Sequence, residues 1–363
     1  MTTTIERDYS LIGSDSDRAQ EQGLVAAEWY HTEIPRKRMK ALMQRRDGPA
    51  IRDTVIWLAL LALTGFGGYW FWGTWACVPF FIAYGVLYGS VSDSRWHESG
   101  HGTAFKTQWL NDALYQFASF MNMKEPTLWR WSHARHHTDT IIVGRDREIL
   151  AMRPPDALRL VVNVLGIRDA IDVVVSVVRH AAGRLTAEEV TFIPESEQHR
   201  VYNEARAWIA VYLVVIALAI TLGTFLPLMY IGLPSLYGRW LAHYFAFTQH
   251  AGLAENVLDH RLNSRTVYMN PVLRFLYWNM NYHIEHHMFP MVPYHALPGL
   301  HAELREDLPV PCRSTIAAYR EILPALLRQL RDPEYYIRRE LPPSAKPFRP
   351  DLHQVVFEGS PQP

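Results

Sequence analysis

Cysteine is almost absent from this chain, whose 363 residues include only Cys77 and Cys312. The two lie far apart and neither belongs to a CxxC pair, which excludes a disulfide framework and an internal iron-sulfur motif. If the protein carries out redox chemistry, we therefore expect its electrons to come from another protein.

The chain also lacks an excess of charge of either sign, because 36 Lys and Arg residues balance 36 Asp and Glu residues. This balance gives no reason to expect nucleic acid as a partner. Residues 1–23 are polar and lack the apolar core of a signal peptide. We expect residues 1–28 to be a disordered, polar and cytosolic N-terminus.

Apolar and aromatic residues are plentiful by contrast, with a hydrophobic fraction of 49% that includes 12 Trp and 18 Tyr. Enrichment in Trp and Tyr is typical of membrane interfaces. A mean hydropathy of -0.10 is nevertheless too polar for a protein made only of membrane spans. We expect a large polar part outside the bilayer.

Long uncharged segments predict transmembrane helices, since ~20 apolar residues cross a ~30 Å hydrocarbon layer. Glycines around Gly73 favour a tight turn between the first two. Residues 207–238 are too long for one upright span, and we divide them between Pro227 and Pro234. The predicted spans are residues 54–72, 74–92, 207–226 and 235–251. The expected fold is an all-α membrane protein with about four transmembrane helices in two hairpins and a cytosolic helical cap.

Basic residues crowd the approach to the first span, whereas the turns of both hairpins carry essentially none. The basic residues are Arg36, Lys37, Arg38, Lys40, Arg45, Arg46 and Arg52. By the positive-inside rule, the cap and both termini face the cytoplasm, and we take the membrane to be a bacterial inner membrane. Residues 113–123 are apolar but too few to cross, so we expect them to lie in the interface.

Outside the spans, two segments have helical patterns. Residues 156–182 are amphipathic and suit a membrane surface, with an ordinary cytosolic core helix as the alternative. Residues 314–330 predict an N-capped amphipathic helix kinked near Pro324. Several prolines after Leu341 indicate a poorly ordered tail. The main domain is therefore expected to cover residues 29–340, and the tail residues 341–363.

Histidine is strongly clustered. Three five-residue windows hold eight of the 17 histidines, where an even spread would place fewer than one. They are His97 and His101, then His133, His136 and His137, and finally His283, His286 and His287. In a helix, positions i and i+4, or i, i+3 and i+4, share a face. Each cluster can therefore direct two or three imidazoles at one point, and the predicted topology brings all three clusters to the same side of the membrane.

Imidazole suits zinc, copper, iron and nickel, so the clusters indicate a metal site without identifying the metal. A zinc ion takes three or four protein ligands, and eight or nine histidines would overfill a single ion. Two ions are the economical interpretation. His250, where the fourth predicted span emerges, is the ninth candidate ligand. We interpret the isolated histidines as structural: His243, His260, His295 and His301.

Acidic residues near the clusters are candidates for orienting the ligand imidazoles through hydrogen bonds. Glu98 and Glu285 lie about 100° around a helix from the adjacent histidine. Asp93 precedes His97 by one helical turn. Asp139 and Asp146 follow the second cluster, where a solvated loop position is the alternative.

The three boxes, HxxxH, HxxHH and HxxHH between paired spans, resemble those of the integral-membrane fatty acid desaturase and hydroxylase superfamily, over roughly residues 54–294. The resemblance implies a non-haem di-iron centre that uses O2 and two electrons to break an unactivated C–H bond. The box histidines would be its ligands, with His250 completing the site. The expected activity is desaturation of a fatty acyl chain. Hydroxylation of a lipid or small molecule, including oxidative demethylation, is the alternative.

The residues around the first two boxes, 96–103 and 131–140, are also similar to a bacterial branch associated with rhizopine catabolism. That resemblance implies a Rieske-type ferredoxin and its reductase as electron donors. The chain has no His-Pro-Gly-Gly motif of a fused cytochrome b5 domain, which agrees with an external donor.

Three arginines near the boxes, Arg95, Arg130 and Arg135, could hold a carboxylate, a phosphate or an acidic ferredoxin, or face lipid headgroups. A metal transporter or sensor is the candidate from a different class. Transporters place their ligands near the bilayer midplane, whereas these histidines stand beyond the ends of the predicted spans.

Overall fold

The computed structural model describes residues 7–163, 166–345 and 348–349. Within these residues the chain is helical, and β-structure is limited to two isolated bridges. The predicted all-α class is confirmed.

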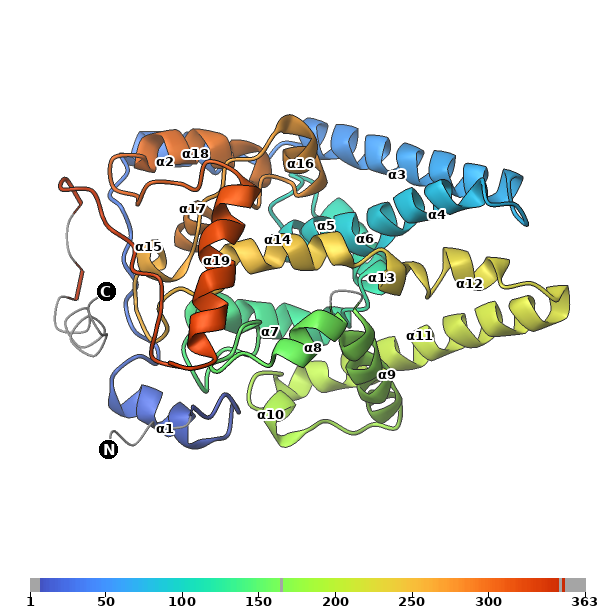
Figure 1. Cartoon of the computed structure of the whole chain (residues 1–363), viewed down its shortest axis with the longest axis horizontal. Helices are drawn as coiled ribbons and strands as arrows, with labels where there is room; N and C mark the ends of the chain where they lie inside the picture. The colour runs from blue at the N-terminus through green and yellow to red at the C-terminus, as the bar shows by residue number, and fades with distance from the viewer. Residues whose placement is uncertain (1–6, 164–165, 346–347, 350–363) are drawn as a thin grey trace.

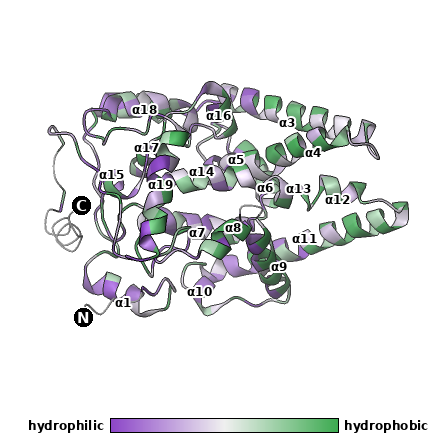
Figure 2. Ribbon diagram, in the orientation of Figure 1, coloured by the Kyte–Doolittle hydropathy of each residue, from purple (hydrophilic) through white to green (hydrophobic). Residues whose placement is uncertain are grey.

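Two antiparallel helical pairs project from one end of the molecule, α3 with α4 and α11 with α12 (Figure 1). Figure 2 shows that this end is mainly hydrophobic, whereas the opposite end, where both termini lie, is rich in hydrophilic residues. The elements of the projecting half are α3 (Asp47–Trp70), α4 (Cys77–Gly85), the π-helical turn η1 (Val86–Ser90), α11 (Glu195–Leu222), α12 (Leu226–Tyr230), α13 (Pro234–Tyr237) and α14 (Trp240–His250).

Two helices in the described residues are long and apolar enough to cross a membrane, Arg36–Trp70 and Glu195–Leu222. They contain most of the first predicted span and most of the third. The second predicted span begins as α4 and continues through η1 toward the first histidine box. The fourth is divided between α13 and α14. The four-span topology therefore stays a prediction.

Glycine allows the second and fourth predicted spans to touch. A Cβ on Gly238 would lie 1.8 Å from the carbonyl oxygen of Gly85, so no other residue fits there. Ser90, in the π-helical turn, donates a hydrogen bond to the carbonyl of Gly238 and accepts one from the backbone N–H of Ala242. These contacts fix the start of α14, and therefore the position of His250 at its end.

The other half of the molecule is a helical cap. Its main core contains large side chains such as Trp278 and Leu300, which are at most 1% exposed, and it extends to the fully buried Trp57 of α3. The cap elements are α1 (Ser14–Glu21), α2 (Arg36–Leu42), α5 (Val91–Gly100), α6 (Gln108–Met121), α7 (Pro126–Thr138), α8 (Ala157–Asn163), α9 (Ile167–Ala181), α10 (Ala187–Val190), α15 (His260–Asn263), α16 (Pro271–Leu276), α17 (His283–Met288), η2 (Tyr294–Ala296), α18 (Leu297–Leu304) and α19 (Thr315–Gln329).

Three helices of the cap test expectations from the sequence. Residues 113–123 lie within α6, whose 14 residues span about 21 Å and are too short to cross a bilayer. In α9, Val174 and Val178 are more than half exposed, which agrees with an amphipathic helix. The N-terminus of α19 is capped by Ser314, which accepts a hydrogen bond from the N–H of Ala317 at 3.1 Å, and Pro324 lies inside this helix as predicted.

The expectation of a disordered N-terminus is wrong for residues 7–28, which include α1 and pack against the cap. We name residues 7–34 the N-terminal strap. Arg7 donates to Glu255 at 2.9 Å and to Glu334 at 2.8 Å, and Leu24 is 1% exposed. The polar composition of this segment suggested disorder, because it does not show that Arg7 pairs with acids far along the chain. Most of the predicted tail, residues 341–363, lies outside the described residues.

Candidate metal centre

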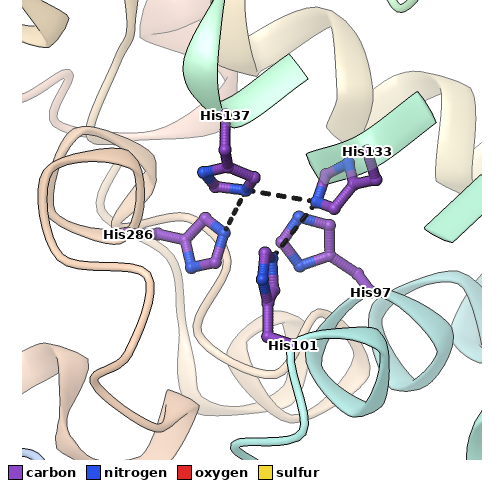
Figure 3. A group of neighbouring side chains, drawn as sticks. All are labelled: His97, His101, His133, His137 and His286. Atoms are coloured by element: carbon purple, nitrogen blue, oxygen red, sulfur yellow. Dashed lines mark hydrogen bonds between the residues drawn. The ribbon is translucent and has the colours of Figure 1, made fainter. Parts of the chain in front are cut away.

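All nine histidines predicted as ligands lie together inside the cap, in two adjacent groups. Within each group, one ring nitrogen of every histidine lies within 4.8 Å of those of the others. The first histidine group is His97, His101, His133, His137 and His286, and Figure 3 shows their rings converging. The second histidine group is His136, His250, His283 and His287.

Helical spacing divides α7 between the two groups. His133 and His137, four residues apart, face the first group, whereas His136 projects about 100° away from His137 and joins the second. One helix therefore holds ligands for both groups.

The same division occurs in α17, where His286 belongs to the first group and His283 and His287 to the second. Because α7 and α17 each contribute to both groups, the two groups are fixed side by side. Each group is completed from a different element, the first by His97 and His101 at the end of α5 and the second by His250 of α14.

The Nε2 atoms of neighbouring histidines make more contacts with one another than hydrogen bonds can satisfy. The contacts are 3.2 Å for His101–His133, His133–His137 and His137–His286, 2.9 Å for His250–His283 and 3.0 Å for His283–His287. A neutral Nε2 carries one hydrogen or one lone pair, so a chain of such contacts cannot be satisfied throughout. Nitrogens bound to one ion at about 2.1 Å would be about 3.0–3.4 Å apart. The spacing fits shared metal ions.

Carboxylates orient two of the histidines from their outer side. Nδ1 of His133 lies 3.1 Å from Glu148, and Nδ1 of His136 lies 2.8 Å from Asp146. A partner on Nδ1 fixes the tautomer that leaves the Nε2 lone pair free for a metal. The prediction for Asp146 is confirmed, whereas Glu148 was missed because it lies in the loop, outside any helical spacing from the box.

Two other histidines of the second group have neutral partners at Nδ1. His250 donates from Nδ1 to the carbonyl of Asn263 at 2.8 Å, and Nδ1 of His287 lies 3.3 Å from the hydroxyl of Thr140. His97 differs, because both of its ring nitrogens are buried without a hydrogen-bond partner. Such an orphaned pair suits a nitrogen that would bind a metal.

Two of the predicted orienting acids, both aspartates, serve other purposes. Asp93 accepts hydrogen bonds from Asn122 and Lys124 rather than from His97. Asp139 pairs with Arg145 at 3.1 Å. Their side chains stabilise the turns around the boxes, which helical spacing from the histidines could not reveal.

The two glutamates inside the boxes also turn away from the ligands. Glu98 accepts from the hydroxyl of Thr103 at 2.6 Å and from the backbone of Tyr294 at 3.0 Å. Glu285 pairs with Thr266 and His301. Being about 100° from the ligand face, they point into the protein and anchor the box helices.

The four isolated histidines lie outside both groups. His301 pairs with Glu285, and Nε2 of His243 lies 3.2 Å from Asp169. His260 stacks on Trp29 of the N-terminal strap, with ring centroids 4.3 Å apart. These contacts agree with structural roles.

Burial sets the protonation state of most ligands. Burial is the largest cause that lowers the pKa of the buried imidazoles, and the neighbouring histidines lower it further. This holds for His97, His101, His137, His283, His286 and His287. They are neutral at physiological pH, the form in which imidazole binds metals.

The two carboxylate-paired positions behave differently. Burial would lower the pKa of His136, but Asp146 raises it above its usual value. Burial would likewise raise the pKa of Glu148, but the neighbouring His133 and His136 lower it. Glu148 is therefore an ionised acceptor for His133.

A cavity of about 160 Å³ reaches the first histidine group from outside. Its walls come from α5, α6, α7 and the segment after α17. The lining residues other than histidines are Trp96, Gly100, Tyr115, Arg130, Ala134, Pro290 and Met291. A small molecule in this cavity would contact His97, His101, His133 and His137 directly.

Of the three arginines near the boxes, only Arg130 lines this cavity. Arg95 is fully buried and donates to the backbone carbonyls of Phe275 and Leu276, so it is structural. Arg135 donates to the hydroxyl of Thr191 at 2.8 Å.

The protein thus combines two helices that are long and apolar enough to cross a membrane with two buried histidine groups. This combination is typical of a membrane-associated protein with a histidine-rich centre suited to metal ions. The chain belongs to the fatty acid desaturase family, which it matches over residues 73–316, a range that includes all nine histidines. It is therefore a desaturase-type oxidoreductase, as the histidine boxes predicted. No curated protein matches this sequence.

Proposed function

We propose that the protein is an O2-dependent di-iron oxidoreductase of the membrane that desaturates a fatty acyl chain in lipid metabolism. The observation that supports this most strongly is the division of nine histidines into two adjacent groups that share α7 and α17. Each group offers enough nitrogens for one iron ion. Because the two groups are adjacent, they suit a pair of ions.

Bound iron would supply the activation of O2 and the removal of hydrogen from an unactivated carbon. The residues of the chain hold and isolate that chemistry. His97, His286 and their neighbours would hold the first ion, and the second group would hold the other. Glu148 and Asp146 keep a proton on Nδ1 of His133 and His136, so that Nε2 stays directed at the metal.

The cavity beside the first group is where the substrate would meet the centre. Removal of a second hydrogen gives a double bond, whereas return of oxygen gives an alcohol, so hydroxylation is the second candidate. The likeness of the first two boxes to the rhizopine-associated branch favours that candidate for a small substrate, where hydroxylation of a methyl group leads to demethylation.

We further propose that four helices cross a bacterial inner membrane, with the cap and both termini in the cytoplasm. The basic residues before α3 and the exposed apolar surfaces of α3 and α11 support this arrangement. A ferredoxin, of Rieske type by the resemblance of the boxes, and its reductase would supply electrons. The two free cysteines, Cys77 and Cys312, cannot hold an iron-sulfur cluster.

Iron analysis of purified variants tests the proposal. His286→Ala removes a ligand from the first group and His136→Ala removes one from the second, and both should lose iron and activity while still inserting into the membrane. The exposed His199 provides the control, because His199→Ala should keep the wild-type iron content. Full iron occupancy in both ligand variants would overturn the assignment.

The mass of the product separates the candidate reactions. Loss of two hydrogens indicates desaturation, gain of one oxygen indicates hydroxylation, and loss of a methyl group indicates demethylation. Metal transport in proteoliposomes, without O2 consumption when ferredoxin and reductant are supplied, would instead favour a transporter.

A further inference from the structure

We propose that Arg130 binds an anionic headgroup of the substrate, a carboxylate or a phosphate, at the mouth of the cavity, and that the substrate is oxidised close to that headgroup. This inference rests on the proposed function, because it places the substrate beside the first histidine group. It adds the substrate's charge and the position of the oxidised carbon.

Arg130 is well placed to bind an anion. Its side chain is 46% exposed, and its guanidinium lies over the ring of Tyr115, 4.6 Å from the centroid. Its acidic neighbour, Asp112, is 3.7 Å away and 53% exposed. An exposed pair of this kind contributes little stability, and a guanidinium has five N–H donors, so a bidentate oxyanion can bind there.

Apart from the histidines of the first group, the wall of the cavity is mainly apolar. Trp96 and Pro290 line it, together with Met291, which is 45% exposed. A Cβ on Gly100 would lie 3.0 Å from the ring of Tyr115, so glycine lets this ring pack closely against α5. The cavity therefore suits a molecule with an anionic head and a short apolar portion.

Helix geometry places the head close to the histidines. Arg130 precedes His133 by three residues and His137 by seven on α7, or about 4.5 Å and about 10.5 Å along the axis. The cavity, at about 160 Å³, is smaller than the roughly 300–1,000 Å³ of typical ligand pockets. A substrate held by Arg130 would therefore present a carbon only a few bonds from its head to the first histidine group.

Binding of a short acid to the full-length, detergent-solubilised protein tests this inference. The probes are butanoate and its neutral analogue butanamide, observed by saturation-transfer NMR. The variants are Arg130→Gln and Arg130→Lys. Arg168→Gln is the matched control, because Arg168 is 55% exposed, lies 3.3 Å from Asp172 on α9 and does not line the cavity.

Butanoate should bind the wild type and Arg168→Gln equally, and Arg130→Gln roughly tenfold or more weakly, because a charge-assisted hydrogen bond is lost. Arg130→Lys should fall between them, since it keeps the charge without the bidentate geometry. Butanamide binding should be insensitive to Arg130. Equal butanoate affinity in the wild type and Arg130→Gln, or no butanoate binding to the wild type, would overturn the inference.

Competition identifies the source of the anionic head. Displacement of butanoate by phosphatidylcholine vesicles that contain phosphatidylglycerol, but not by phosphatidylcholine alone, supports a lipid head. Displacement only by soluble acids supports a soluble substrate. The NMR measurement needs no iron. If the protein takes up no iron but binds butanoate through Arg130, the proposed function is refuted and the inference on Arg130 is not. Normal iron content and O2 consumption with Arg130-independent binding would refute this inference alone.

Discussion

Glu148 holds His133 from behind, its carboxylate 3.1 Å from Nδ1 and opposite the Nε2 that faces the first histidine group. The hydroxyl of Ser132 donates to the other oxygen of Glu148 at 3.0 Å, so the carboxylate is itself fixed. Because the Glu148 carboxylate is both fixed in place and charged, we expect it to influence how strongly His133 binds a metal.

Replacement of Glu148 should therefore weaken metal binding without removing a ligand. Loss of a carboxylate that orients a histidine typically costs 10–100-fold in affinity, and we expect about tenfold or more for Glu148→Gln. Competition for iron against a chelator measures the change. Asp139→Asn is the matched control, because Asp139 is a buried acid of the same loop that pairs with Arg145 instead of a histidine. Equal losses in the two variants would show that Glu148 acts only through the fold.

The N-terminal strap supports the cap through Trp29. Its ring stacks on His260, with an interplanar angle of 9°, and its indole N–H donates to the carbonyl of Thr138 at 2.9 Å. His260 in turn lies 5.1 Å, centroid to centroid, from His287 of the second group. The strap therefore covers the side of the centre where α15 lies.

Trp29→Ala should destabilise the folded protein by about 3–5 kcal/mol, as expected for removing a buried Trp side chain. Trp29→Phe should cost less, because it keeps an aromatic ring against His260. Thermal unfolding of the solubilised protein measures both. Trp109, which is 67% exposed, is the control, and Trp109→Ala should change stability by less than about 0.5 kcal/mol. An unchanged melting temperature in Trp29→Ala would contradict a supporting role for the strap.

The grouping of the candidate ligands was predictable because helical spacing is a local property. The i, i+4 pair of His133 and His137 and the intervening His136 lie in one short helix, so their directions follow from 3.6 residues per turn. Glu148 and Glu98 were not predictable in this way. Their partners depend on loop conformation and on contacts with residues far along the chain, such as Tyr294.

The interruption of the fourth predicted span also could not be predicted from the local sequence. Hydropathy indicates an uncharged segment, but the break between α13 and α14 accompanies the close approach of Gly238 to Gly85, more than 150 residues earlier. The strap was missed for a related reason, since Arg7 finds Glu255 and Glu334 only in the folded chain. Composition reports neither kind of contact.

A buried histidine in α9 predicts a pH-dependent stability. His180 is fully buried, with Nδ1 2.8 Å from Glu125 and Nε2 3.2 Å from Glu189, and Arg179 lies beside it. Burial would lower the pKa of His180, but the two carboxylates raise it from 6.5 to about 9. The raised pKa means that the stabilisation is complete below pH 6.5 and is lost as the pH rises through about 9.

The melting temperature should therefore fall between these two pH values, and the fall should be smaller in His180→Gln. That variant should also be less stable at neutral pH by about 3–5 kcal/mol, because the buried Glu125 loses its cation and Glu189 keeps only its pair with Arg179. The exposed His199 again provides the control, and His199→Gln should keep the wild-type pH profile. An identical pH profile in His180→Gln would exclude this group as the source.

Accessibility of the two hairpin turns tests the four-span topology. Trp75, between α3 and α4, is 90% exposed, and Phe225, between α11 and α12, is 72% exposed. The 24 residues of α3 span about 36 Å, enough to carry the first turn across a ~30 Å hydrocarbon layer. Both turns should therefore lie on the side of the membrane opposite to the histidine groups.

Single cysteines introduced at these positions, in a Cys77→Ser and Cys312→Ser background, report the side on which each turn lies. A membrane-impermeant maleimide should modify Trp75→Cys and Phe225→Cys in right-side-out vesicles. It should modify Arg313→Cys, which is on the exposed surface of the cap, only in inverted vesicles. Labelling of either turn from the same side as Arg313→Cys would mean that the hairpin containing that turn does not cross the membrane.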